Sequence, residues 1–100
     1  MSFVFTHSNH IANLDSATLT LFQDQVYWEK DILQDLASDW KTIEYLLPSF
    51  DPEGSSWKRT GFPTKIKYIL FKFNSKSAPL TGSFEIRNAH LIRAMQKTRA

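Results

Sequence analysis

Hydrophobic residues between positions 16 and 47 recur at the spacing of an amphipathic helix. They follow alternating intervals of three and four positions, and Glu29 is the one polar member of the series. The series is Leu19, Phe22, Val26, Glu29, Leu33, Leu36, Trp40, Ile43 and Leu47. This spacing is that of a coiled-coil seam sustained over about four heptads. It predicts a long helix over 16–47, which Pro48 ends because the residue before a proline avoids the helical region.

The length of this helix leaves two arrangements open. An unbroken helix over 16–47 would measure about 48 Å, whereas a compact domain of this size has a radius of gyration of about 13 Å. Either the helix breaks at Ser38 and Asp39, which favour cap positions, or it stays whole and packs against a second copy. The unbroken phase of the seam favours the second arrangement. The expected self-association residues are Trp28, Leu33, Leu36 and Trp40.

The remaining patterns predict strands and a second helix. Alternating residues predict a strand over 3–7. The segment 65–73 is apolar on both faces through 69–71, which is typical of a central strand. A partner strand is expected over 83–87 and a C-terminal helix over 89–98. The predicted fold class is α+β: a long or broken helix and a C-terminal helix on a small antiparallel sheet of about three strands.

Composition limits the class of protein. A chain of 100 residues forms a single domain, 1–100, and 42% hydrophobic with 22% charged residues is typical of a folded protein. Cysteine is absent, so a disulfide or a thiolate metal site is excluded. We find no secretory signal and no apolar run long enough to cross a membrane. These features predict a cytoplasmic location, no membrane partner and no cofactor.

Charge is distributed unevenly along the chain. Residues 1–50 carry seven acidic and two basic residues, whereas residues 51–100 carry three acidic and ten basic residues. Such asymmetry favours a polyanionic partner or the association of opposite faces of two copies. The alternative is that the two halves fold together and their charges mix on one surface.

A basic and aromatic stretch over 55–73 is the strongest candidate for binding. Its aromatic side chains can stack on bases or anchor a protein, and its cations can pair with anionic groups. The expected partner-binding residues are Trp57, Lys58, Arg59, Lys65 and Lys67, with Arg93 and Lys97 of the C-terminal helix. The alternative interpretation of 69–73 is a core strand with lysines near its ends.

Candidates for catalysis are weaker. His7 and His10 lie three positions apart, but a metal site would need further ligands. Asp31, Asp35 and Asp39 follow a helical spacing, which is typical of a solvated face or a docking site for a basic partner. The chain has no phosphate-binding glycine pattern and no nucleophile motif. The sequence therefore predicts neither an enzyme nor a metal site.

Two functional hypotheses remain. The first is a small non-enzymatic interaction protein, an adaptor or inhibitor that regulates a larger protein with an acidic surface, and that forms a homodimer. The alternative is a nucleic-acid-binding accessory protein that contacts phosphates through the 57–67 loop and the C-terminal helix. The heptad seam is a stronger regularity than the basic stretch, so the protein partner is favoured.

Overall fold

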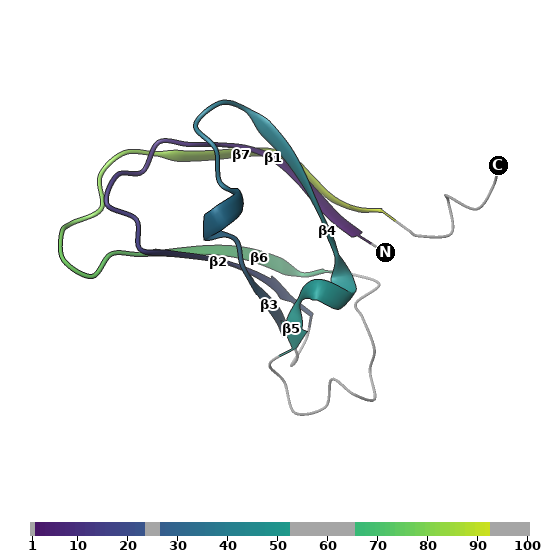
Figure 1. Ribbon diagram of the computed structural model, residues 1–100. Coiled ribbons are helices and arrows are strands. Elements are labelled where there is room, and N and C mark those ends of the chain that lie inside the picture. The colour runs from purple at the N-terminus through teal and green to yellow at the C-terminus, as the bar shows by residue number, and fades with distance from the viewer. Residues whose placement is uncertain (1, 24–26, 53–65, 93–100) are drawn as a thin grey trace.

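Two antiparallel β-sheets pack face to face in the computed structural model, which describes residues 2–23, 27–52 and 66–92 (Figure 1). The elements are β1 (Ser2–Asn9), β2 (Ser16–Phe22), β3 (Tyr27–Asp31), η1 (Leu33–Asp35), β4 (Lys41–Leu46), η2 (Leu47–Ser49), β5 (Asp51–Pro52), β6 (Tyr68–Asn74) and β7 (Phe84–Ile92). One sheet has the strand order β4-β1-β7, and the other has the order β5-β3-β2-β6.

The predicted long helix is wrong, because 16–47 contains β2, β3, η1 and β4 instead. Along β4 the buried Ile43 and Tyr45 alternate with exposed neighbours, which is the period of a strand. The heptad series does not form one face either: Leu19 lies in the core, whereas Trp40 is exposed.

Residue type explains why the strand period prevails over the helical spacing. In β2 the fully buried Ala17, Leu19 and Leu21 alternate with Thr18 and Thr20. Threonine is stiff at χ1 and fits a pleated surface better than a helix. The spacing of three and four therefore arises from residues of three separate strands, β2, β3 and β4, and of the segments that follow them.

The C-terminal helix predicted over 89–98 is also wrong for residues 89–92, because these residues belong to β7, which continues to Ile92. Residues 93–98 lie outside the described part of the chain. The α+β class is therefore corrected to an all-β sandwich. The strand predicted over 3–7 is confirmed by β1. None of the helices in the described residues is long and apolar enough to span a membrane.

The core lies between the two sheets. Phe3 and Phe5 of β1 face Leu19 and Leu21 of β2, and all four side chains are almost inaccessible to solvent. Trp28 of β3 is buried in the same cluster. Large aromatic side chains supply much buried area in a small domain, and the sandwich therefore has a continuous core without disulfides.

One lateral side of the sandwich is closed by the connection from β3 to β4. This connection contains η1, which lies between the two layers (Figure 1). Ile32 is fully buried, and Leu33 and Leu36 pack against the core. The hydroxyl of Tyr45 donates a 2.7 Å hydrogen bond to Asp35, which joins η1 to β4. Phe50 extends the cover after η2.

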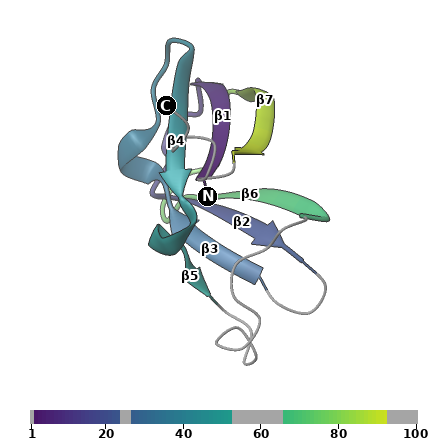
Figure 2. The same cartoon turned by 90° about the vertical axis from the view of Figure 1, so that its right-hand side faces the viewer.

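The opposite lateral side is formed by the edge strands β6 and β7, which lie on the right in Figure 2. β6 pairs only with β2 and β7 only with β1 among the described strands. The prediction that 65–73 forms a buried central strand is therefore wrong. Tyr68, Ile69 and Leu70 are 69%, 40% and 42% exposed.

β1 and β7 form the longest pairing in the three-stranded sheet, from Ser2 opposite Ile92 to Asn9 opposite Phe84. A register shift interrupts this pairing between Val4 and Thr6. Asn88 of β7 has a φ of 57°, a left-handed conformation that asparagine tolerates better than most residues. The shift is a β-bulge, which bends this edge strand.

The two connections that cross between the sheets next to β1 and β7 are joined to each other. The amide of His10 donates to the carbonyl of Ser83, and the amide of Ala12 donates to that of Thr81. Gly82 has a φ of 109°, and a Cβ built there would lie 1.9 Å from the carbonyl oxygen of His10. Glycine therefore permits this close approach of two backbones.

Candidate interaction surface

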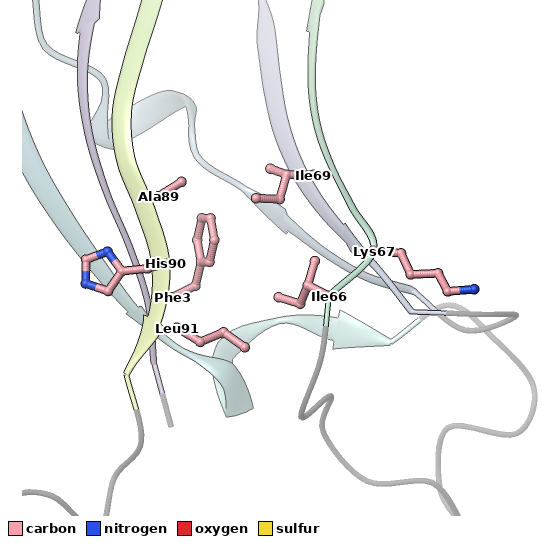
Figure 3. Close-up of a pocket in the computed structure, with 7 residues that line it drawn as sticks. All are labelled: Phe3, Ile66, Lys67, Ile69, Ala89, His90 and Leu91. Atoms are coloured by element: carbon pink, nitrogen blue, oxygen red, sulfur yellow. The ribbon is translucent and has the colours of Figure 1, made fainter.

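A cleft opens between β6 and β7, on the side of the sandwich that these two edge strands form (Figure 3). Its volume is about 360 Å³, and its lining residues are Phe3, Ile66, Lys67, Ile69, Ala89, His90 and Leu91. The side chains of Phe3, Ile66, Ile69 and Leu91 point into the cleft, whereas those of Lys67 and His90 point away from it (Figure 3). The interior of the cleft is therefore apolar, and its outer margins carry polar groups.

Aromatic side chains close the other part of this side. The Phe84 ring lies 5.2 Å from that of Phe71 and 4.8 Å from that of Phe73, between ring centroids. It also stacks on His7 at 5.7 Å. Phe84 therefore fills the space between β6 and β7 at one end, and the open part is confined to the end near Ile66 and Leu91.

A second feature is a row of three aromatic side chains across β3, β2 and β6. Phe22 is the cross-strand neighbour of both Tyr27 and Tyr68. The ring centroid of Phe22 lies 5.2 Å from that of Tyr27 and 6.4 Å from that of Tyr68. Phe22 and Tyr27 are partly exposed, and Tyr68 is largely exposed. We call these three residues the aromatic row.

Basic residues belong to both edge strands or lie next to them. Lys67 and Lys72 flank the exposed part of β6, and Arg87 projects from β7. Lys72 Nζ lies 3.9 Å from a carboxylate oxygen of Glu29 in the same sheet. The guanidinium carbon of Arg87 lies 3.6 Å from the centroid of the Trp40 ring, a cation–π contact.

The predicted partner-binding residues are only partly covered by the structure. Lys67 is exposed at the margin of the cleft (Figure 3). The other members of the predicted set lie outside the described residues: Trp57, Lys58, Arg59, Lys65, Arg93 and Lys97.

The predicted self-association residues are not brought together on one surface. Trp28 is 1% exposed and belongs to the core. Leu33 and Leu36 are partly buried against the core from the η1 connection. Trp40 is 45% exposed, but it lies beneath Arg87 on the outer side of the other sheet. The helical seam that would have aligned these four residues does not exist.

His7 and His10 have separate environments. His7 is fully buried, and its Nε2 accepts a 3.0 Å hydrogen bond from the amide of Ala37. Burial lowers the pKa of His7; a backbone hydrogen bond with Lys41 partly opposes this shift, and the charge of Lys41 adds to it. His10 Nε2 lies 3.0 Å from the hydroxyl of Ser8. Within the described residues no three His, Cys, Asp or Glu side chains gather as a metal site would require.

The acidic residues that shared a helical spacing have local structural partners instead. Asp31 accepts a 3.1 Å hydrogen bond from the amide of Leu33, and Asp35 accepts from Tyr45. Asp39 lies in a bend before β4. These residues do not form the single helix face on which a docking site for a basic partner was predicted.

Sequence reasoning favoured a buried central strand for Ile69 and Leu70, which are exposed on β6. A strand that is apolar on both faces can be central, or it can be an edge strand that presents apolar groups to a partner. The signal that separates these cases is the number of neighbouring strands, which local sequence does not contain.

Comparison of the chain with protein-family models, with curated proteins and with solved structures finds no match. The candidate surface therefore has to be interpreted from its own geometry.

Proposed function

We propose that this chain is a non-enzymatic interaction protein, an adaptor or inhibitor of a larger protein. The observation that supports this proposal is the exposure of apolar side chains along the two edge strands, β6 and β7. Tyr68, Ile69 and Leu70 of β6 and Ile86 of β7 are each 39–69% exposed. Large exposed apolar patches on small folded proteins commonly mark binding sites.

The chemistry of this side favours an extended segment of a partner protein. The edge of β6 that pairs with no other described strand can hydrogen-bond to an added strand, which is a common mode of peptide recognition. The adjacent apolar cleft can then receive a side chain of that strand. Specificity would come from the shape of the cleft, and affinity from the main-chain hydrogen bonds.

Charge favours a partner with an acidic surface. Lys67 and Lys72 lie beside and on β6. In the described part of β7 the charged residues are Glu85 and Arg87, and the Arg87 guanidinium lies over Trp40 on the outer side of the other sheet. Complementary charge raises the rate of association more than it raises affinity. The lack of cysteine in the sequence is compatible with a reducing compartment, and we therefore place this interaction in the cytoplasm.

The experiment compares partner capture by three forms of the protein: wild type, Ile69→Glu and Leu46→Glu. Ile69 lines the cleft, whereas Leu46 is 57% exposed on β4, away from it. Captured proteins are identified by mass spectrometry, and the complex is then rebuilt from purified components and measured by calorimetry. We expect Leu46→Glu to bind like wild type and Ile69→Glu to lose at least about tenfold in affinity. Equal binding by both variants would contradict the proposal.

A second candidate function is supported by the aromatic row. Aromatic side chains on an exposed sheet face stack on unpaired bases, and nearby lysines neutralise phosphates. Titration with fluorescent single-stranded RNA and DNA at low and high salt separates this candidate from the first. Binding that falls steeply with salt and is lost in Tyr68→Ala indicates nucleic acid. A protein complex that persists at high salt indicates the first candidate.

A further inference from the structure

We infer that β6 pairs with β6 of a second copy of this chain, antiparallel and about a two-fold axis, so that the two four-stranded sheets become one continuous sheet. This inference rests on the proposed function only in assigning binding to the side of the sandwich formed by β6 and β7. It goes further because it names a second copy as an occupant of this edge and gives the register; the second copy and a partner segment would then compete for the same edge of β6. The axis is placed at Leu70.

The argument begins with the state of the four edge strands. β7 is bent by the bulge at Asn88, and β5 is two residues long and ends in a proline. The side of the sandwich next to β4 is covered by the η1 connection, through Asp35 and Tyr45. Short strands, bulges, prolines and covering segments are the devices by which proteins protect sheet edges from uncontrolled pairing.

β6 has none of these devices in the described part of the chain. Its seven residues pair with β2 without a register shift, from Tyr68 opposite Phe22 to Asn74 opposite Ser16. It contains neither proline nor glycine, and its one charged residue is Lys72. A lysine on an edge strand is a further protective device, and Lys72 is the one that β6 carries; the regular apolar remainder of this edge is a template for another strand.

The strand that pairs with the free side of β6 can be β6 of a second copy, because a two-fold axis relates the two strands. An antiparallel pairing of a strand with itself has a two-fold axis perpendicular to the sheet, which keeps the core face of each copy on the same side. With the axis at Leu70, Leu70 lies opposite its own copy, and Tyr68 lies opposite Lys72. Ile69 lies opposite Phe71 on the core side, where the cleft opens.

Charge is compatible with this register. A lysine directly opposite a lysine would be destabilising, but here Lys72 faces Tyr68, whose ring can accept a cation at its face. The Lys72 ammonium also lies within ion-pair distance of Glu29 in its own sheet. Self-pairing of β6 therefore brings no like charges together.

The dimer would be closed. Pairing uses the free edge of β6 in both copies, and the far end of each sheet is the short β5, whose proline lacks an amide hydrogen. The continuous sheet therefore cannot extend by the same contact, and a dimer forms instead of a fibre.

The test uses the absence of native cysteine. Light scattering coupled to size exclusion is recorded for wild type over a range of concentrations, and single-cysteine variants are oxidised and examined without reductant. Leu70→Cys is expected to form a disulfide-linked dimer, because residues opposite each other across a pair have Cβ atoms about 5 Å apart. Lys72→Cys is the matched control: its two copies would lie roughly 13 Å apart along the strands, and it should stay uncrosslinked.

A second pair of variants tests the interface without oxidation. Leu70→Lys places two ammonium groups opposite each other and should raise the dimer dissociation constant at least about tenfold. Leu46→Lys, at an exposed site of β4, should leave it unchanged. Circular dichroism confirms that each variant is folded. A wild type that is monomeric at every concentration, or a dimer that Leu70→Lys leaves intact, overturns the inference. Neither result affects the capture experiment with Ile69→Glu.

Discussion

At the scale of single residues, His7 is the side chain whose ionisation is most closely tied to the fold. It is fully buried between Phe5 and Phe84, and its Nε2 accepts a hydrogen bond from Ala37. Burial favours the neutral ring, so its pKa in the folded protein lies below the usual 6.5. The unfolded chain therefore takes up a proton at a higher pH than the folded chain does.

The consequence is a loss of stability in mild acid. The contribution of neutral His7 is fully present above about pH 6.5 and is lost as the pH falls through the lowered pKa of the folded state. The free energy of unfolding should decrease by at most about 1.4 kcal/mol per pH unit in this range. Denaturant titrations across this range measure the effect. His7→Gln should remove this pH dependence, whereas His90→Gln, at an exposed site, should keep it.

Gly82 is a second residue whose identity the fold depends on, because the position leaves no room for a Cβ atom. Alanine there would place a Cβ against the carbonyl oxygen of His10 and would also have to adopt a positive φ. We expect Gly82→Ala to lower the free energy of unfolding by more than about 2 kcal/mol. Thermal unfolding provides the measurement, and Ser83→Ala is the neighbouring control. A melting temperature equal to that of the control would show that the two connections can separate without cost.

At the scale of elements, hydrogen bonds from β1, β2 and β4 hold the η1 connection to the sandwich. The Tyr45 hydroxyl donates to Asp35, and Lys30 Nζ lies 5.1 Å from the centroid of the Tyr45 ring. Burial and the hydrogen bond to Asp35 both raise the pKa of Tyr45, so its hydroxyl stays protonated and remains a donor.

Removing that hydroxyl tests how firmly the connection is held. Tyr45→Phe keeps the ring but leaves Asp35 without its donor, so stability should fall by about 1 kcal/mol. Tyr68→Phe, in a side chain 69% exposed, should change stability little. Chemical denaturation of both variants provides the comparison. Equal stability of Tyr45→Phe and wild type would mean that core packing and the hydrogen bonds to β1 and β2 hold the connection without this hydroxyl.

The elements also show which parts of the fold could be predicted. The strand 3–7 was predictable because its alternation is short and has no competing pattern. The helix over 16–47 failed because Leu19, Phe22, Ile43 and Leu47 satisfy a helical spacing although they belong to three separate elements, β2, β4 and η2. Pairing partners such as β2 and β6 are distant in the sequence, and a local pattern carries no information about them.

At the scale of the whole molecule, the asymmetry of charge along the sequence does not become two separate faces. β1 and β4 of the acidic half share a sheet with β7 of the basic half, and β2 and β3 share one with β6. The contact between Lys72 and Glu29 joins the two halves directly. The candidate surface could be predicted only to the extent of Lys67, because exposure of β6 depends on the sheet order.

The pairing of β1 with β7 has a consequence for folding. Among the described strands these are the first and the last, so their sheet can form only when almost the whole chain is available. Closing so long a segment costs conformational entropy before any contact between the two strands compensates for it. Refolding should therefore be slow for a chain of this length, in the range of about milliseconds to seconds that is typical of all-β sandwiches. While refolding proceeds, β6 would remain exposed to other chains, so refolding yield should fall as protein concentration rises.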